Sequence, residues 1–211
     1  MSENRMIPLS EPEISGNEWK YIKECLDTGW VSSVGGYVEK FEKMLASYSG
    51  AGYAVATVNG TSALHVSLIA CGISPGDEVI VPTLTFIAPV NAVRYCGAYP
   101  VFMDCDKDTL CIDVQKTSEF IKNECEQGKD GFTYNRKSGR KVKAIIPVHI
   151  FGHPADMAPL LEVSKKYNIH LIEDATESLG SEYKGKKAGS FGSTGCFSFN
   201  GNKIITTGGG G

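Results

Sequence analysis

The sequence predicts an α/β fold in which a largely parallel (mixed) sheet carries helices on both faces. Short apolar runs typical of strands alternate along the chain with segments whose apolar residues recur every three or four positions, as on one side of a helix. Repeated βα units of this kind assemble into open sheets with helices on each face. With 211 residues, of which 42% are hydrophobic, the chain can bury a sizeable core.

Two amphipathic helices are predicted near the N-terminus. In residues 17–26 the apolar side chains Trp19, Ile22 and Leu26 fall on one side of a helix, and residues 38–48 repeat the same spacing. The polar residues between them would face water. Both segments therefore predict surface helices with one apolar side.

The rest of the chain continues as alternating strands and helices. Residues 53–58 are β-branched and alanine-rich and predict a strand, and the apolar run 63–71 predicts a helix that stops at Gly72. Further strands are expected at 78–81, 101–103, 144–148, 171–173 and 196–199, helices at 85–95, 117–126 and 157–167, an exposed loop or hairpin at 128–141 and a hairpin turn at 182–187.

Composition argues against nucleic acid or a membrane as a partner. The chain has 21 basic and 24 acidic residues, a net charge of −3, and the basic cluster at 136–143 fits a polar loop. Residues 1–5 lack the apolar stretch of a signal peptide, and no segment reaches membrane-spanning length. We therefore expect a soluble, cytoplasmic protein.

The cysteines predict neither disulfides nor a metal site. There are seven, an odd number, and no two have CxxC spacing. We expect reduced thiols, several of them buried as small apolar residues.

Lys203 is the most informative residue of the sequence. It follows the apolar run 196–199, and threonines and glycines follow it at 206–211. A lysine that carries pyridoxal phosphate needs a fixed, dry site beside a strand, where its amine can be neutral and nucleophilic. The ring nitrogen of that cofactor needs a carboxylate partner to stay protonated, and Asp174 ends a short apolar strand. Although most lysines are simply solvated, the two residues together indicate a pyridoxal phosphate enzyme.

Other candidates occupy predicted strand ends, where such sheets bind their ligands. Gly60, Thr61 and Ser62 could bind a phosphate through backbone N–H groups, hydroxyls and the positive end of the following helix, or a hydroxyl could simply cap that helix. Phe86 could stack on a flat cofactor or be a core aromatic.

Two further polar residues also have two interpretations. His149, after the strand at 144–148, could line the same cleft or be a satisfied structural histidine. Ser198 could give a hydroxyl to the phosphate or be a buried serine bonded to the backbone. The terminal glycines do not form a nucleotide loop, since the GxxxxGK[ST] pattern is absent.

Five motifs occur in a fixed order along the chain. They are NGTSAL at 59–64, PGDEVIVP at 75–82, VHIFG at 148–152, EDA at 173–175, and FSF at 197–199 leading to Lys203 and TGGG at 207–210. Together they resemble the DegT/StrS family of nucleotide-sugar aminotransferases, which are fold type I pyridoxal phosphate enzymes. The resemblance spans nearly the whole chain and implies the large domain of that fold. Within the family, residues 200–207 resemble the LegC-like branch, which implies a UDP-linked 4-keto-6-deoxy-N-acetylhexosamine as substrate.

The resemblance implies a role for each candidate residue. Lys203 would carry the cofactor covalently and move a proton during transfer, and Asp174 would pair with the ring nitrogen. Glu177 stands near the phenolic oxygen, where many relatives carry glutamine, so its role is open. The other implied cofactor contacts are Phe86 on the ring and Gly60, Thr61, Ser62 and Ser198 around the phosphate, while His149 and Asn200 would line the substrate side.

The same resemblance implies glutamate as amino donor, a nucleotide sugar as acceptor and a homodimer. Residues 1–211 would form the N-terminal part and most of the cofactor-binding large domain, with the small C-terminal domain absent from this chain. Two alternatives stay open: a non-catalytic cofactor-binding regulatory or partner-binding protein, and a related aminotransferase acting at another sugar carbon. Family members with histidine at the lysine position act as dehydratases, and Lys203 argues against that activity.

Overall fold

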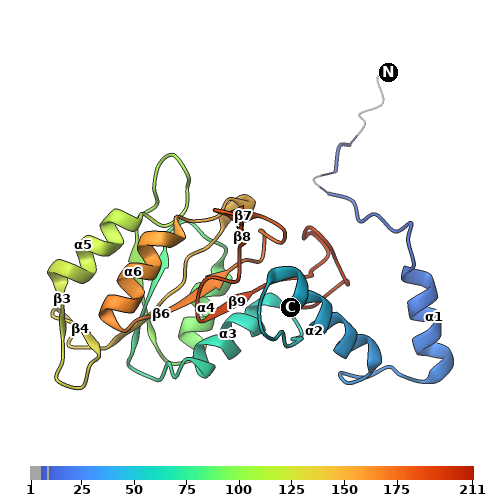
Figure 1. Cartoon of the computed structure of the whole chain (residues 1–211), viewed down its shortest axis with the longest axis horizontal. Helices are drawn as coiled ribbons and strands as arrows, with labels where there is room; N and C mark the ends of the chain where they lie inside the picture. The colour runs from blue at the N-terminus through green and yellow to red at the C-terminus, as the bar shows by residue number, and fades with distance from the viewer. Residues whose placement is uncertain (1–5, 9) are drawn as a thin grey trace.

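The computed structural model describes residues 6–8 and 10–211, and a five-stranded parallel sheet forms its centre (Figure 1). The strands lie in the order β2-β1-β5-β6-β9, and each neighbouring pair is parallel. Their bounds are β1 (Glu78–Pro82), β2 (Tyr99–Met103), β5 (Val142–Ile145), β6 (His170–Asp174) and β9 (Thr194–Cys196). The expected α/β class is confirmed.

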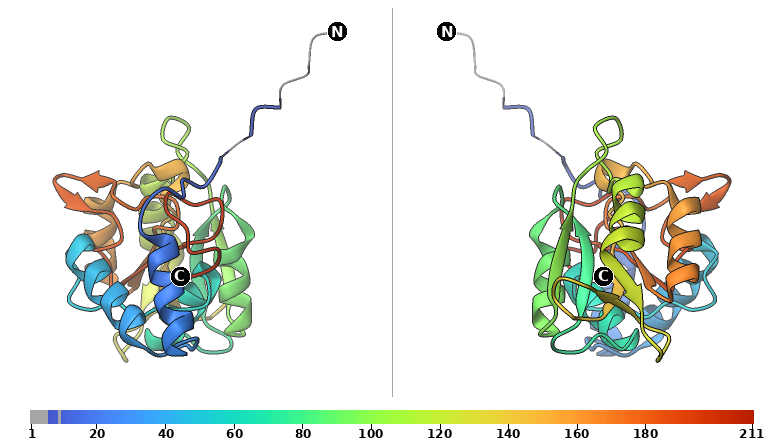
Figure 2. Two further views of the ribbon diagram at one scale, coloured as in Figure 1. Left: turned by 90° about the vertical axis from the view of Figure 1, so that its right-hand side faces the viewer. Right: turned by 90° about the vertical axis from the view of Figure 1, so that its left-hand side faces the viewer.

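Helices cover both faces of this sheet, as Figure 2 shows. The helices of one face are α3 (Gly60–Ala70) and α4 (Ile87–Tyr95), and those of the other are α5 (Val114–Glu124) and α6 (Met157–Tyr167). Val79 packs in the cluster that contains Leu64 of α3, whereas the next residue, Ile80, packs in the cluster that contains Leu160 of α6. Successive strand residues point to opposite faces. A strand buried on both sides is therefore apolar throughout rather than alternating.

Short hairpins and a 3-10 turn extend this core. The pair β3 (Cys125–Gln127) and β4 (Thr133–Asn135) and the pair β7 (Glu182–Tyr183) and β8 (Lys186–Lys187) are antiparallel. Both lie in or beside the segments predicted as hairpins. The turn η1 (Ile150–Gly152) follows β5 and leads toward α6.

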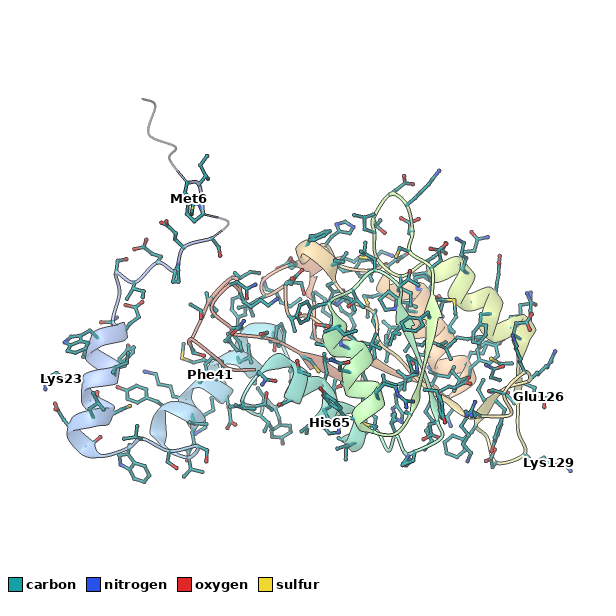
Figure 3. The ribbon with its side chains drawn as sticks, turned by 180° about the vertical axis from the view of Figure 1, so that it is seen from behind. Met6, Lys23, Phe41, His65, Glu126 and Lys129 are labelled. Carbon is teal, nitrogen blue, oxygen red and sulfur yellow. The ribbon has the colours of Figure 1, made fainter. Side chains whose placement is uncertain are left out.

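The N-terminal helices form an arm that extends from this body (Figure 1). The arm consists of α1 (Glu18–Thr28) and α2 (Gly36–Ser49), both predicted from their apolar spacing. Phe41 of α2 packs edge-on against Phe199, with ring centroids 4.9 Å apart. In α1, which is described throughout, no residue is buried. Figure 3 places Lys23 of α1 at one end of the molecule and Glu126 at the other.

Three of the predicted strands differ from the structure, and one of them is the strand expected at 144–148, since β5 is Val142–Ile145. Residues 53–58 are not a strand, and of these residues Thr57 alone exchanges backbone hydrogen bonds with Gly211, at 2.7 and 3.0 Å. Residues from this segment and from 189–197 line a cavity of about 580 Å³, and within the described residues no strand pairs with 53–58. The last strand ends at Cys196 instead of continuing to residue 199.

The sequence predicted no membrane-spanning segment, no metal site and no signal peptide, and the structure bears on these predictions only through the residues that it describes. Across 6–8 and 10–211, no helix has the length and apolar character needed to cross a bilayer. Across the same ranges, no group of three or more His, Cys, Asp or Glu residues could hold a metal ion. Residues 1–5, on which the signal-peptide expectation depends, lie outside the described residues.

The strand order defines where a ligand would bind. From β1 the chain passes to β2 on one side, then returns to β5 on the other side. In open α/β sheets, ligands bind beyond the carboxyl ends of the strands near such a reversal. The carboxyl ends of β1, β5, β6 and β9 carry most of the residues that the sequence singled out.

Candidate active site

Asp174 is fixed at the carboxyl end of β6 by backbone hydrogen bonds on both sides. Its N–H donates to the Pro147 carbonyl at 2.9 Å, and its carbonyl accepts from the His149 N–H at 3.0 Å. The side chain accepts from the Thr176 N–H at 3.1 Å. The residue is only 3% exposed, so its carboxyl is held in one place with little contact to water.

The surroundings of Asp174 have opposing effects on its pKa. Burial raises the pKa because the charged form loses its hydration, and this effect exceeds the others. Hydrogen bonds from Thr176 and the nearby His149 and Lys203 act in the opposite direction. A buried carboxyl of this kind favours a positively charged group close to it, such as a protonated ring nitrogen.

Lys203 lies close enough to Asp174 to influence its charge and makes a direct contact with Glu177. Its Nζ is 3.2 Å from Glu177 Oε1, and the lysine side chain is 18% exposed. The Lys203 N–H donates to the Asn200 carbonyl at 3.0 Å, which forms a tight turn after the last strand. The structure therefore brings together three of the predicted residues: Lys203, Asp174 and Glu177.

The N-terminus of α3 lies against the segment that contains Ser198. A Cβ added at Gly60 would lie 2.9 Å from Ser198 Cβ and 3.1 Å from Thr176 Cγ2, so this position has no room for a side chain. Asn59 caps the helix, since its side chain accepts from the Ser62 N–H at 2.8 Å. The alternative in which Thr61 or Ser62 is the cap is therefore wrong, and both residues lie in the first turn of the helix.

Phe86 follows the carboxyl end of β1 and immediately precedes α4. Its side chain is 77% exposed, so the interpretation as a core aromatic is wrong. The hydroxyl of Thr85 is buried and is one of the described side-chain oxygens that have no hydrogen-bond partner. An exposed ring beside an unpaired buried hydroxyl fits a position next to a ligand.

His149 differs from its predicted role as a substrate contact. It is fully buried; Nε2 lies 3.0 Å from Glu173 Oε2, and Nδ1 accepts from the Ala155 N–H at 3.1 Å. These bonds use both ring nitrogens, which leaves none to face a substrate. The structural interpretation of this histidine is the one that the contacts support, while its backbone N–H still fixes Asp174.

Glu173 is a residue whose importance the sequence did not reveal. It is fully buried, and besides His149 its carboxylate accepts hydrogen bonds from the backbone N–H groups of Gly189, Phe191 and Gly192, at 2.6 to 2.8 Å. It thereby ties the segment before β9 to β6, directly beside Asp174. An acid inside an otherwise apolar strand was the available signal, because such a charge must be paired.

Ser198 and Asn200 lie in the segment between β9 and Lys203. Ser198 is partly buried and its hydroxyl accepts from the Asn200 N–H at 3.4 Å. Asn200 is exposed, and its side-chain amide donates to Asn202 Oδ1 at 3.2 Å. Ser198 therefore lies beside the first turn of α3, and Asn200 lies at the surface.

Comparison with known proteins assigns the family. The sequence profile of the DegT/DnrJ/EryC1/StrS aminotransferase family matches residues 12–211. The chain belongs to this family. It is a family of pyridoxal phosphate-dependent aminotransferases that includes sugar aminotransferases, so the expected cofactor and enzyme class are those of the family.

Two curated relatives within the family are GDP-perosamine synthases. The protein from Caulobacter vibrioides is 48% identical over 211 residues, which cover 100% of this chain and 52% of that protein. The protein from Escherichia coli O157:H7 is 47% identical over 207 residues, 98% of this chain and 52% of that protein. The chain spans about half the length of the curated relatives it matches. Both relatives are named for a GDP-linked sugar, whereas the LegC-like branch implied a UDP-linked one.

Solved structures of the family share the fold. An aminotransferase from Psychrobacter cryohalolentis has a TM-score of 0.81 at 35% identity, covering 95% of this chain and 47% of that one. Spr1654 from Streptococcus pneumoniae, provisionally named a sugar aminotransferase and solved in its PLP form, has a TM-score of 0.83 at 30% identity and covers 97% of this chain and 51% of that one. These likenesses confirm that the chain has the fold of the large domain of pyridoxal phosphate aminotransferases.

Proposed function

We propose that this chain is the cofactor-binding part of an enzyme that moves an amino group from glutamate, through pyridoxal phosphate, to the keto group of a nucleotide-linked 4-keto-6-deoxy sugar. The observation that carries the proposal is the convergence of Lys203, Glu177 and the buried Asp174 at adjoining strand ends. An amine beside a buried carboxyl, at the sheet edge where ligands bind, is the arrangement that this cofactor needs.

The residues at this edge fit the cofactor. The buried carboxyl of Asp174 would hold the ring nitrogen, and the exposed ring of Phe86 would stack on the cofactor ring. The close contact of Gly60 with Ser198 places the first turn of α3 beside a hydroxyl, as binding of a phosphate requires. Thr61 and Ser62 would add their hydroxyls there. Because the chain spans about half the length of its curated relatives, we further propose that residues 1–211 include most of the cofactor-binding domain.

The catalytic work divides between the cofactor and the protein. When bound, pyridoxal phosphate withdraws electrons from the carbon that loses a proton. Asp174 would pair with the ring nitrogen and fix the orientation of the ring. Lys203 would hold the cofactor, and its free amine would be the base that takes the proton from the donor carbon and later returns one to the sugar carbon. The side chains therefore supply orientation and one proton carrier.

We propose GDP as the nucleotide, in place of the UDP that the sequence first implied. The support is the 48% and 47% identity to two GDP-perosamine synthases. Perosamine is an amino sugar, so synthesis of its GDP derivative fits amination of a GDP-linked 4-keto-6-deoxy sugar. The second candidate function is that of a related aminotransferase that acts at another carbon of the sugar.

Two other activities are less well supported. A dehydratase of this family would carry histidine at the lysine position, and this chain has Lys203. A non-catalytic cofactor-binding protein would not need the Lys203 amine beside Glu177 at the sheet edge. A cytoplasmic location stays a prediction of the sequence.

We also propose that the protein forms a homodimer through its N-terminal arm. Trp19, Ile22 and Leu26 of α1 are all more than half exposed, as is Trp30 beyond its end. A contiguous apolar surface of this kind is usually an interaction site.

Borohydride reduction in the presence of pyridoxal phosphate tests the proposed function. The purified chain should retain cofactor on the peptide that contains Lys203, as determined by mass spectrometry, and Lys203→Ala should lose this label completely. Lys187→Ala, which removes another partly buried lysine, should keep the label on Lys203. Label scattered over surface lysines in the wild type would contradict the proposal.

A further inference from the structure

Glu177 connects segments of the candidate site that are distant in sequence. Its Oε1 lies 3.2 Å from Lys203 Nζ, and its Oε2 accepts a hydrogen bond from the Phe151 N–H at 3.1 Å. The neighbouring Gly152 approaches the Glu177 carbonyl so closely that an added Cβ would lie 3.0 Å from it. Both carboxylate oxygens therefore have a partner, one on the turn η1 and one on the lysine.

The backbone of Phe151 is strained in a way that serves this contact. Its φ of 53° and ψ of 23° lie in the left-handed region, which is unfavourable for a bulky side chain. The Phe151 ring is 75% exposed, so packing of the ring does not explain the conformation. What the conformation does provide is an N–H that points at the Glu177 carboxylate. Strained residues persist where the surrounding structure holds them, and they gather at functional sites.

The charges around Lys203 show what Glu177 contributes. Asp174 on β6 is buried and fully fixed by the backbone, and the His149 ring on the segment after β5 is taken up by Glu173. Glu177 is the carboxylate in direct contact with the lysine, and its side chain is 41% exposed. A pair with this much exposure has moderate strength and can be broken without unfolding the site.

We propose that Glu177 is a positioning residue that holds the charged end of Lys203 at the sheet edge until the cofactor arrives. The inference rests on the proposed role of Lys203 as the lysine that carries the cofactor. An ammonium ion has no free electron pair, so it cannot attack the cofactor aldehyde. Capture then requires that Lys203 leave Glu177 and release one proton to water, after which the amine adds to the aldehyde carbon with loss of water. Glutamine at this position would contact the lysine without supplying a negative charge.

Pulsed acetylation of the cofactor-free chain measures how strongly Glu177 affects the reactivity of the Lys203 amine. Acetic anhydride reacts only with neutral amines, and mass spectrometry of the Lys203 peptide gives the rate for that residue. Glu177→Gln should label Lys203 about threefold to fivefold faster than wild type at neutral pH, because an ion pair of this exposure has about that influence. At strongly alkaline pH the Lys203 amine is neutral in both proteins, so wild type and Glu177→Gln should be labelled at the same rate.

Two control variants test whether faster labelling comes from the lost charge of Glu177 or from a general change in structure. Glu182→Gln breaks the comparable pair of Lys187 and Glu182, 2.8 Å apart, and should leave Lys203 labelling unchanged. Phe151→Gly keeps the N–H, accepts the left-handed backbone and removes only the exposed ring, so it too should label like wild type.

Two results would overturn the inference. The first is equal labelling of wild type and Glu177→Gln at neutral pH. The second is an acceleration that persists at alkaline pH, which would mean that the substitution only exposes the lysine. Acetylation requires no cofactor, so its outcome is independent of whether borohydride fixes pyridoxal phosphate on Lys203. Failure of the proposed function and failure of this inference are thus distinguishable.

Discussion

The carboxyl end of β6 and the helix α1 differ in how completely the chain itself buries and pairs their side chains. At the edge, Glu173 is fully buried and its carboxylate has four hydrogen-bond partners, all within this chain. In α1, Trp19 is 73% exposed and Leu26 is 60% exposed. The polar groups of the first region find their hydrogen-bond partners within the chain, whereas the second region presents apolar surface that the chain leaves uncovered.

This contrast separates two sources of function. Buried polar groups that are fully paired fix geometry, because any movement leaves a donor or acceptor unsatisfied. An exposed apolar helix face gains stability only when something covers it. The candidate site therefore depends on bonds inside the chain, whereas the arm depends on association if the proposed homodimer forms through it. Substitutions in the two regions should differ in kind as well as in size.

The largest effect on stability is expected at Glu173. Glu173→Gln replaces one acceptor oxygen by an NH₂ group that faces N–H donors, so at least one buried donor loses its partner. We expect a loss of about 3 kcal/mol in the free energy of unfolding, measured by urea denaturation. Glu182→Gln, on an exposed pair, should change it by less than about 0.5 kcal/mol. Equal effects of the two variants would show that the buried network does not stabilise the site.

A smaller effect, dependent on pH, is expected at Asp174. Burial raises the pKa of its carboxyl above the ordinary 3.8, so the folded state binds the proton more tightly than the unfolded state. The resulting stability is fully present below pH 3.8 and is lost as the pH rises through the folded-state pKa. Relative to Asp174→Asn, wild-type stability should fall across that window with a slope of up to about 1.4 kcal/mol per pH unit. Urea denaturation at a series of pH values measures this difference, and parallel curves would contradict it.

Local patterns in the sequence were sufficient for most of the fold. The strand β6 and the helix α6 were predicted almost to the residue, because their apolar periodicity is independent of the rest of the chain. The segment 53–58 has strand composition but no adjacent strand, and composition carries no information about a pairing partner. The strand prediction for 53–58 therefore failed because strand formation depends on a pairing partner that is distant in sequence.

The same limit applied to the candidate site. Lys203 and Asp174 could be found because each follows a recognisable apolar run. For His149 the sequence left two interpretations open, because its bond to Glu173, 24 residues away, cannot be read from either local pattern. Contact between Glu177 and the Phe151 N–H was equally hidden, because it depends on a left-handed backbone at a bulky residue.

The smallest effect on the stability of a single chain is expected in α1, and it gives the sharpest test of the contrast. Replacing Trp19 and Leu26 together by serine removes apolar side chains that are more than half exposed in this chain. The free energy of unfolding at low protein concentration should change by less than about 0.5 kcal/mol. Self-association, measured by sedimentation equilibrium, should weaken at least about tenfold, because large apolar side chains dominate such interfaces. Lys23→Ala, also on exposed α1, should affect neither quantity. A loss of stability comparable to that of Glu173→Gln would mean that α1 packs against its own chain, and the two regions would then not differ in kind.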